Sequence, residues 1–318
     1  MTTRFELHDL TGWSEFLHTH GYAVIKSVIT KEQAAEALDE MWALMEALSP
    51  VRKDRPKTHR LGKNWPSMLH GGMVQYIGHA PLQWRLRELC ATVYARYYDT
   101  EATNLATSFD GLCMMHSARK YQRGGELLSF MHTDQSPRRK EEWSIQGLIN
   151  LADAGPDDGG LVVIPGTHTE HQAFFTGHPR GDQKSDWYKL TDVEKNRYRD
   201  RVIKVCAEPG DFLLWDSRTF HANTVPVRPG AIRACTYICM LPQERISKHI
   251  RYNRQKAWNE RRTSSHHPGD GFRMFPTLPR FVTDRDRFLA TVRTQMQPTL
   301  TDAQTALLCG TGQQTLVR

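Results

Sequence analysis

The strongest chemical signal in the sequence is a histidine and an aspartate two residues apart, His132 and Asp134. On a β-strand, side chains at positions i and i+2 point to the same face. This spacing would therefore bring an imidazole nitrogen and a carboxylate oxygen to one point, where they could bind a metal ion. A third ligand is needed, and His221, which follows the apolar run 212–215, is the best candidate. Two histidines and one carboxylate leave open coordination positions, an arrangement typical of non-haem Fe(II) oxygenases.

A His-x-Asp string alone is weak, because the chain contains 15 histidines. Three further features strengthen it: a Gly-Gly turn, an apolar run and a Pro-Gly turn over 159–168; Pro-Gly-Asp at 209–211, which opens the strand that leads to His221; and Arg233 among apolar neighbours. A buried guanidinium without an anion is costly. Arg233 therefore needs a partner, and its planar fork fits a carboxylate in bidentate fashion.

Two amide side chains are further candidates for the site. Gln146 lies between apolar residues of a predicted strand and needs a hydrogen-bond partner, which could be a ligand or the backbone. Asn223, two residues beyond His221, could hydrogen-bond to a bound cofactor, but a turn residue before Pro226 is at least as good an interpretation. We interpret His168, after the Pro-Gly turn, as structural rather than metal-ligating.

The elements that must position these residues form a β-rich centre. Short β-like runs separated by Gly, Pro and Asp turns predict a barrel or sandwich. The predicted strands are 111–117, 129–133, 144–150, 160–164, 201–206, 212–215 and 231–240. The polar segment 170–200 interrupts this pattern, and a capping box at Thr191 opens a short helix within it.

Helical segments are expected at both ends. A short strand at 22–25 precedes a helix that begins after a capping box at Thr30, and a second helix is predicted over 81–98. Residues 51–79 are predicted to be a long loop, and a last helix opens near residue 301. The expected fold is mainly β with flanking helices, in a single domain over 1–318. Its β core spans about 105–245, between a helical N-terminal part and a basic C-terminal extension.

The composition of the 318 residues excludes several classes of protein. With 39% hydrophobic and 24% charged residues the chain is globular rather than disordered. No apolar run reaches the roughly 18 residues that span a bilayer, and the acidic, broken start does not predict a signal peptide. The six cysteines form no CxxC pair, so reduced thiols and a cytoplasmic location are expected. The net charge of +7 comes with 35 acidic residues, and neither a membrane nor nucleic acid is an expected partner.

Taken together, these residues resemble the phytanoyl-CoA dioxygenase-like group of Fe(II)/2-oxoglutarate oxygenases. The matching segments are His132-Thr133-Asp134, 159–168, 209–221 and Arg233, in the family's order and at similar spacing. The resemblance implies a double-stranded β-helix (jelly-roll, cupin-like) core. It also implies Fe(II) held by His132, Asp134 and His221, 2-oxoglutarate bound through its distal carboxylate to Arg233, and O2 as a co-substrate. Thr167 stands where the family usually has serine.

The resemblance predicts a dioxygenase that hydroxylates, or otherwise oxidises, an unactivated C–H bond of a small organic substrate. Asp134 argues against halogenation, because halogenating relatives have a small residue there. The substrate could be anionic, since Arg138, Arg139 and Arg218 are basic and Trp187 could close over it.

Three alternatives stay open at this point. A different metal on the same barrel could carry out hydrolysis or isomerisation, although Arg233 would then have no anion to meet. The chain could be a non-catalytic binding protein, which the complete ligand set speaks against. It could also be an oxygenase that acts on nucleic acid, which would need a basic groove and a pocket for a flipped base. A monomer and a homodimer are equally expected.

Overall fold

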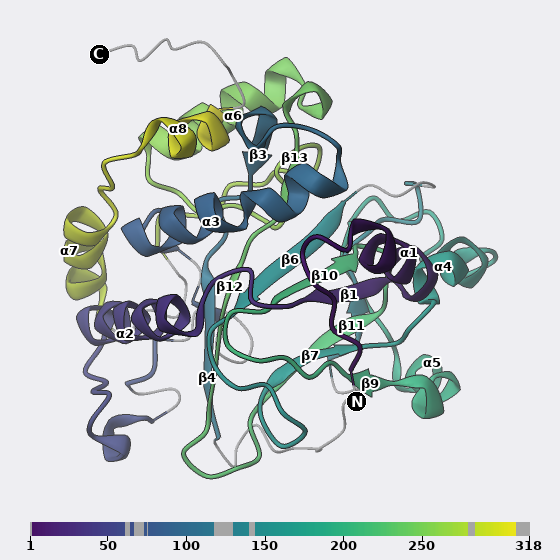
Figure 1. The fold of residues 1–318 in the computed structure, drawn as a ribbon, viewed down its shortest axis with the longest axis horizontal. Helices are drawn as coiled ribbons and strands as arrows, with labels where there is room; N and C mark the ends of the chain where they lie inside the picture. Colours follow the sequence, from purple (N-terminus) through teal and green to yellow (C-terminus); the bar gives the residue numbers. More distant parts are fainter. Residues whose placement is uncertain are drawn as a thin grey trace. The chain divides into compact units, whose positions relative to one another are not determined.

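Figure 1 shows a computed structural model of the chain, which describes residues 2–60, 64–66, 73–74, 76–117, 130–139, 144–278 and 284–309. The chain forms two compact units, each built from two separate stretches of sequence. Unit 1 comprises Met1–Thr30 and Met115–Arg233, and unit 2 comprises Lys31–Met114 and Ala234–Arg318. All six site residues predicted from the sequence belong to unit 1. The prediction of one domain over the whole chain stays a prediction.

The first sheet of unit 1 brings together strands that are far apart in the sequence. Antiparallel pairs join β1 (Tyr22–Ile25), β10 (Phe212–Asp216) and β6 (Ile145–Asn150) in that order. Every residue of these strands is buried, so both faces of this part of the sheet are covered. Helix α1 (Leu10–His20) ends at Gly21, whose left-handed backbone turns the chain into β1.

The second sheet of unit 1 carries the predicted histidine ligands. Its order is β8 (Tyr188–Lys189), β5 (His132–Thr133), β11 (His221–Thr224), β7 (Gly160–Val163) and β9 (Ile203–Lys204), and neighbouring strands are antiparallel. Side chains cross from one sheet to the other: the amide of Gln146 on β6 reaches Asp134, and the ring of Trp215 on β10 lies 5.4 Å from that of His221. Two antiparallel sheets thus enclose the site, as in a double-stranded β-helix.

The polar segment 170–200 covers the other face of this second sheet. It includes most of α4 (Thr167–Phe175) and all of α5 (Asp192–Arg197), and α5 begins with the predicted capping box at Thr191. The segment packs apolar side chains against the sheet, in a buried cluster that consists of Met131, Val162, Ile164, Phe175, Tyr188, Leu190, Tyr198, Phe220 and Ala222. Because β-strand side chains alternate between faces, Met131 points into this cluster while His132 points to the enclosed side.

Unit 2 is mainly helical. Its helices are α2 (Lys31–Leu48), α3 (Pro81–Tyr97), α6 (Lys248–Asn259), α7 (Arg285–Gln295) and α8 (Asp302–Cys309), with short strands β2 (Met73–Val74), β3 (Leu105–Thr107) and β13 (Met240–Pro242). Two strands, β4 (Leu112–His116) and β12 (Ile232–Tyr237), span the sequence boundaries of the units. No helix in the described ranges is long and apolar enough to cross a membrane.

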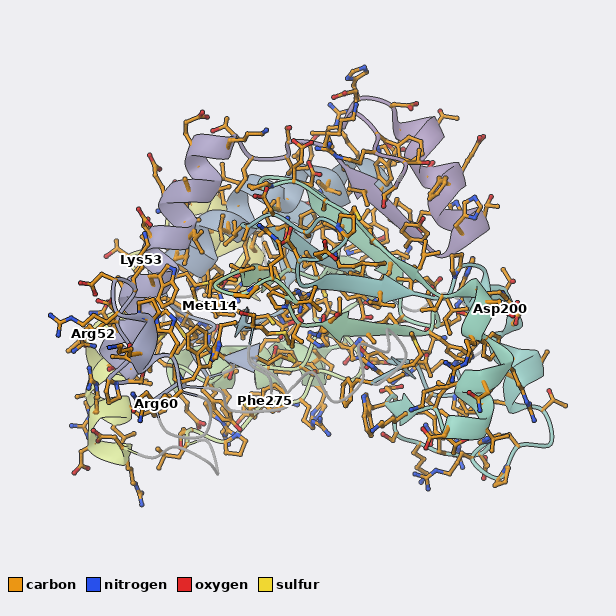
Figure 2. The ribbon with its side chains drawn as sticks, turned by 90° about the horizontal axis from the view of Figure 1, so that it is seen from below. Arg52, Lys53, Arg60, Met114, Asp200 and Phe275 are labelled. Atoms are coloured by element: carbon orange, nitrogen blue, oxygen red, sulfur yellow. The ribbon has the colours of Figure 1, made fainter. Side chains whose placement is uncertain are left out.

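The basic segment after α2 begins by capping that helix. Arg52 and Lys53, labelled in Figure 2, lie four and five residues after Leu48, the last residue of α2. Arg52 donates to the carbonyl oxygens of Glu46 and Ser49 at 3.4 and 3.3 Å, which satisfies part of the helix's C-terminal end. The first basic side chain of the predicted loop 51–79 therefore caps the helix, and residues 61–63, 67–72 and 75 of the loop lie outside the described residues.

The predicted fold class is confirmed, and the main differences concern short elements. The structure contains α1, α4, β2, β3, β8 and β11, none of which the sequence pattern predicted, and β2 lies within the predicted loop 51–79. Strand β11 was missed because His221-Ala222-Asn223-Thr224 has little apolar alternation. Its neighbours β5 and β7 supply the hydrogen bonds that make it a strand.

Candidate metal centre

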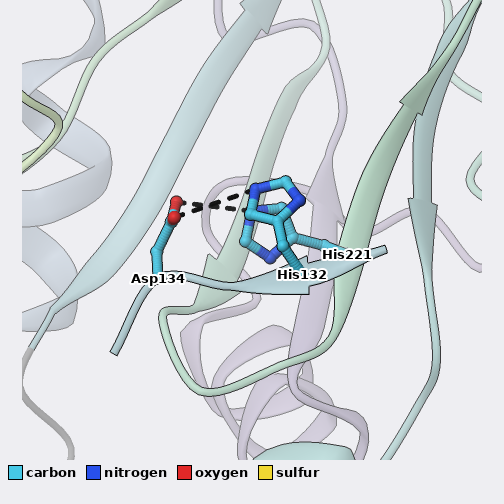
Figure 3. Close-up of side chains that lie close together, drawn as sticks. All are labelled: His132, Asp134 and His221. Atoms are coloured by element: carbon cyan, nitrogen blue, oxygen red, sulfur yellow. Dashed lines mark ion pairs between the residues drawn. The ribbon is translucent and has the colours of Figure 1, made fainter. Parts of the chain in front are cut away.

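The structure brings His132, Asp134 and His221 together between the two sheets of unit 1 (Figure 3). The Nε2 atom of His132 lies 3.7 Å from Asp134 Oδ1, and Nε2 of His221 lies 3.5 Å from Asp134 Oδ2. One potential ligand atom from each residue lies within 4.8 Å of the others. Two ligand atoms that each lie about 2 Å from a metal ion, at right angles to each other, are about 3 Å apart. Small rotamer changes would therefore let the three residues bind one metal ion.

Backbone carbonyls fix the tautomer of both histidines. Nδ1 of His132 lies 2.8 Å from the carbonyl oxygen of Phe130, and Nδ1 of His221 lies 2.9 Å from that of Thr219. A carbonyl oxygen can only accept, so each neutral ring carries its hydrogen on Nδ1. The Nε2 lone pairs are thereby left for coordination and point toward the carboxylate of Asp134. Such second contacts orient a metal-binding histidine and raise its basicity.

Strand register places the three side chains next to one another. His132 on β5 is directly opposite His221 on β11, so both rings lie on one face, with centroids 4.2 Å apart. The chain then leaves β5, and the backbone N–H of Asp134 donates to the carbonyl oxygen of Ser217 at 3.0 Å. This bond holds the aspartate beside the loop that leads into β11.

The Pro-Gly-Thr-His segment supports β11 and not the metal directly. The hydroxyl of Thr167 accepts from the N–H of Phe220 at 2.9 Å and donates to the carbonyl oxygen of Ile164 at 2.8 Å. Nε2 of His168 donates to the carbonyl oxygen of His18 at 2.8 Å. This agrees with a structural role for His168, and threonine supplies the hydroxyl that this position uses.

Gln146 acts on a metal-site residue. Its side-chain Nε2 donates to Asp134 Oδ2 at 2.9 Å, and the whole residue is buried. Trp215 lies opposite Gln146 in the register of β10 and β6, so both side chains are on the face that meets the centre. The sequence indicated Gln146 as a cofactor-binding candidate, and the contact that the structure gives it is with the carboxylate of Asp134.

Arg233 and Asn223 lie toward the other end of β11. Asn223 is in the strand rather than a turn and shares the face of His221. Arg233 on β12 is 2% exposed, and its Cβ packs so closely on Gly159 that a methyl group there would lie 2.7 Å from it and 2.9 Å from the carbonyl oxygen of Thr224. Thr224 is three residues beyond His221, about 10 Å along the strand. Gly159 thus lets Arg233 approach the end of the strand that begins with His221.

A family model described as "Phytanoyl-CoA dioxygenase (PhyH)" matches residues 17–224, which is more than half of the chain. The chain belongs to the phytanoyl-CoA dioxygenase family. Enzymes of this family use Fe(II), 2-oxoglutarate and O2. The protein is accordingly a 2-oxoglutarate-dependent non-haem iron dioxygenase.

Two curated proteins are similar to the chain at about a quarter sequence identity. The Ava biosynthesis cluster protein O of Aspergillus versicolor is 25% identical over 244 residues, which cover 73% of the chain and 77% of that relative. A putative phytanoyl-CoA dioxygenase of Dictyostelium discoideum is 26% identical over 137 residues, which cover 43% of the chain but only 37% of the relative.

Solved structures show the fold that the chain shares. The epimerase SnoN, crystallised with Fe3+, alpha ketoglutarate and nogalamycin RO, superposes with a TM-score of 0.50 at 16% identity over 74% of the chain and 84% of its own. A hypothetical protein from Escherichia coli gives a TM-score of 0.57 at 14% identity over 92% and 86% of the two chains. These likenesses agree with the jelly-roll core.

The basic side chains considered for substrate binding in this dioxygenase are mostly ion-paired. Arg138 and Arg139 pair with the carboxylates of Asp182 and Asp186 at 2.9 and 3.0 Å. Arg218 pairs in the same way with Asp216 at 2.6 Å. The paired arginines fix the segment around 182–186 to the turn after Asp134, and they give no support to an anion site there.

Sequence reasoning missed several groups that shape this centre. The carbonyls of Phe130 and Thr219 orient the histidines, but a main-chain carbonyl has no signature in a sequence. Trp215 was predicted only as an apolar strand residue. Its position opposite Gln146 could have indicated the site, had the register of β10 and β6 been known.

Proposed function

We propose that His132, Asp134 and His221 hold Fe(II) in this dioxygenase, and that it oxidises a C–H bond of a small organic molecule. The observation that carries the proposal is the pair of imidazoles whose Nδ1 atoms donate to main-chain carbonyls, which leaves two Nε2 lone pairs beside one buried carboxylate. This donor set of two neutral nitrogens and one anionic oxygen fits ferrous iron and leaves coordination positions free.

Arg233 and Asn223 are proposed to bind the 2-oxoglutarate. Arg233 supplies a buried, bidentate cation for the distal carboxylate, close to the end of β11. Asn223 lies on the face of His221 between that end and the metal ligands, where its amide can hydrogen-bond to the bound cosubstrate.

The metal and its two cosubstrates together supply the oxidising chemistry. The overall reaction consumes the C–H compound, 2-oxoglutarate and O2 and yields the hydroxylated product, succinate and CO2. In this reaction the chain's residues bind and orient the reactants and keep water out. Because Asp134 occupies a carboxylate position among the ligands, we propose hydroxylation, or an oxidation derived from it, and not halogenation.

The proposed iron ligands can be tested by replacing each with alanine. Anaerobic titration with Fe(II) should show at least a tenfold loss of affinity for His132→Ala and His221→Ala, because each loses one of three protein ligands. His249→Ala, which removes an exposed histidine of α6, should bind iron as the wild type does. Unchanged iron affinity in a triad variant would remove that residue from the proposal.

The proposed role of Arg233 can be tested by measuring 2-oxoglutarate binding and Fe(II) binding separately. Arg233→Ala should raise the 2-oxoglutarate concentration needed for half-maximal succinate formation by at least tenfold and leave Fe(II) affinity unchanged. The reason is that the lost guanidinium binds the carboxylate of 2-oxoglutarate and not the metal. Arg228→Ala, which removes a more exposed arginine paired with Asp158, is the matched control. An equal loss of iron and 2-oxoglutarate affinity would mean that Arg233 is structural.

The same assay distinguishes the alternative of a non-oxidative metal enzyme. Wild-type protein with Fe(II), 2-oxoglutarate and air should form succinate, because the proposed reaction decarboxylates 2-oxoglutarate to succinate. A metal-dependent hydrolase or isomerase on this barrel would form none.

A further inference from the structure

One strand of the covering segment borders the metal centre. Strand β8 pairs with β5, and Lys189 is directly opposite His132 in the register. Residues directly opposite one another on paired strands point to the same face. Lys189, His132 and His221 therefore form one row across three strands, and Trp187, two residues before Lys189, shares their face. Tyr188 between them points to the opposite face, into the buried cluster.

An exposed aromatic surface results on this side of His132. The ring of Trp187 is centred 6.2 Å from the ring of His132 and 6.1 Å from that of Phe130. The Trp187 side chain is 46% exposed, whereas its neighbour Tyr188 is buried. The Tyr188 hydroxyl donates a hydrogen bond to Glu194 Oε2 at 2.9 Å. Tryptophan is usually largely buried, so an indole this exposed beside a metal ligand indicates a surface that a ligand covers.

A cation completes this surface. The Lys189 ammonium lies 5.5 Å from the centre of the Phe130 ring. In the described ranges no carboxylate lies within ion-pair distance of it, and Asp192, on which it acts electrostatically, already pairs with Lys195 at 2.7 Å. Its charge is therefore available to an anion, unlike those of Arg138 and Arg139.

We propose that Trp187, Phe130 and Lys189 form the substrate subsite, and that it takes a planar aromatic or conjugated molecule that carries a carboxylate. The rings would stack on the planar part, and the ammonium would meet the carboxylate. The subsite lies on the β8 side of His132, whereas Arg233 lies toward the strands on the other side of β11, so substrate and 2-oxoglutarate do not compete. This inference rests on the proposed function, because it assigns the substrate class of that same site.

Calorimetry with three probes tests the subsite on the whole 318-residue chain without iron, so that binding is measured apart from turnover. The probes are 2-naphthoate, its uncharged analogue 2-naphthylmethanol and the aliphatic acid decanoate. We expect 2-naphthoate to bind most tightly, also in the presence of 2-oxoglutarate. Trp187→Leu should weaken it about tenfold and Trp187→Phe much less, because phenylalanine keeps a ring. Lys189→Met should weaken 2-naphthoate up to about fivefold and leave 2-naphthylmethanol unchanged.

Matched variants control for unspecific effects. Tyr252→Leu removes an exposed aromatic of α6, and Lys184→Met removes an exposed lysine of the same segment as Lys189. Both should bind 2-naphthoate as the wild type does. Equal losses in these controls, decanoate binding as tightly as 2-naphthoate, displacement by 2-oxoglutarate, or no binding to the wild type would overturn the subsite. Binding without any succinate formation on addition of iron, 2-oxoglutarate and air would contradict the proposed function instead.

Discussion

The three residues of the candidate metal centre are held in different ways. Main-chain carbonyls fix the two histidines, whereas the carboxylate of Asp134 takes a hydrogen bond from the side chain of Gln146. A main-chain acceptor survives any substitution of its own residue that leaves the backbone in place. A side-chain donor does not, so the orientation of Asp134 depends on residue 146 in a way that the histidines do not depend on residues 130 and 219.

Gln146→Leu is therefore expected to weaken Fe(II) binding by about 10- to 100-fold without loss of the fold, as for other supporting partners of metal ligands. Leucine has a similar volume but no donor, so the carboxylate loses the bond that orients it. Fe(II) titration checks the affinity, and circular dichroism checks the fold. Phe130→Leu, which keeps the carbonyl that holds His132, should bind iron nearly as the wild type does. If both variants bind iron equally well, the amide of Gln146 does not position Asp134.

Residue types and spacing indicated the triad and Arg233, because chemistry restricts which side chains can bind iron and a carboxylate. They also indicated Gln146, through the cost of burying an amide. They could not indicate its partner, because the contact depends on how β6 faces the turn after β5. The sequence does not decide between a turn and a ligand role for Asn223, because a run of four polar or small residues does not reveal a strand.

At the scale of elements, a glycine turn holds the loop that leads into β11. Gly21 ends α1 with φ +79°, and a methyl group there would collide with the hydroxyl of Thr219 and lie 2.6 Å from Nδ1 of His168. The hydroxyl of Thr219 donates to the carbonyl oxygen of Gly21 at 2.9 Å, while the carbonyl of Thr219 accepts from His221. The turn after α1 thus helps to position His221, a proposed metal ligand 200 residues away in sequence, through Thr219.

Gly21→Ala should lower the free energy of unfolding by at least about 2 kcal/mol, because it combines a disfavoured backbone conformation with a collision. Gly177→Ala is the control, since Gly177 also has a positive φ (+70°) but nothing within 4 Å of an added methyl group. Gly177→Ala should lower the free energy of unfolding by only about 1 kcal/mol. Denaturant unfolding measures both. If the two variants are equally destabilised, contacts at Thr219 and His168 contribute nothing.

The strongly patterned elements were predictable, and those that depend on partners were not. The helix after Thr30 and the helix over 81–98 have clear apolar periodicity and end signals, and both are present as α2 and α3. Strand β8 has only two residues and exists because β5 offers it an edge. Strand β11 likewise depends on its two neighbours, β5 and β7. Pairing partners distant in sequence, and not local preference, decide such strands.

On the scale of the whole molecule, a buried histidine makes the free energy of unfolding depend on pH. His79 in unit 2 is fully buried and donates from Nε2 to the carbonyl oxygen of Arg262 at 2.9 Å. Burial, with the nearby charge of Arg87, lowers the pKa of His79 to about 3. The unfolded chain, with an ordinary histidine pKa of about 6.5, takes up a proton as the pH falls while the folded protein does not. Stability is therefore lost below the unfolded pKa.

Between pH 7 and pH 5 this histidine should lower the free energy of unfolding by about 2 kcal/mol. His79→Gln should remove that part of the pH dependence, because glutamine keeps a donor but does not titrate. Denaturant unfolding at both pH values measures the difference. His249→Gln, which replaces an exposed histidine, is the control. An unchanged pH dependence in His79→Gln would show that His79 does take up a proton in the folded protein.

Strand β1 also has a practical consequence for anyone who shortens this chain. A version that began at α2 would keep every residue proposed to bind iron, 2-oxoglutarate and substrate, and a search for functional motifs would find nothing missing. It would lack the strand that covers the edge of β10, which pairs with β1 from Tyr22 to Ile25. An uncovered edge of apolar residues promotes association between copies, so such a truncated version should aggregate on expression even though its active-site residues are all present.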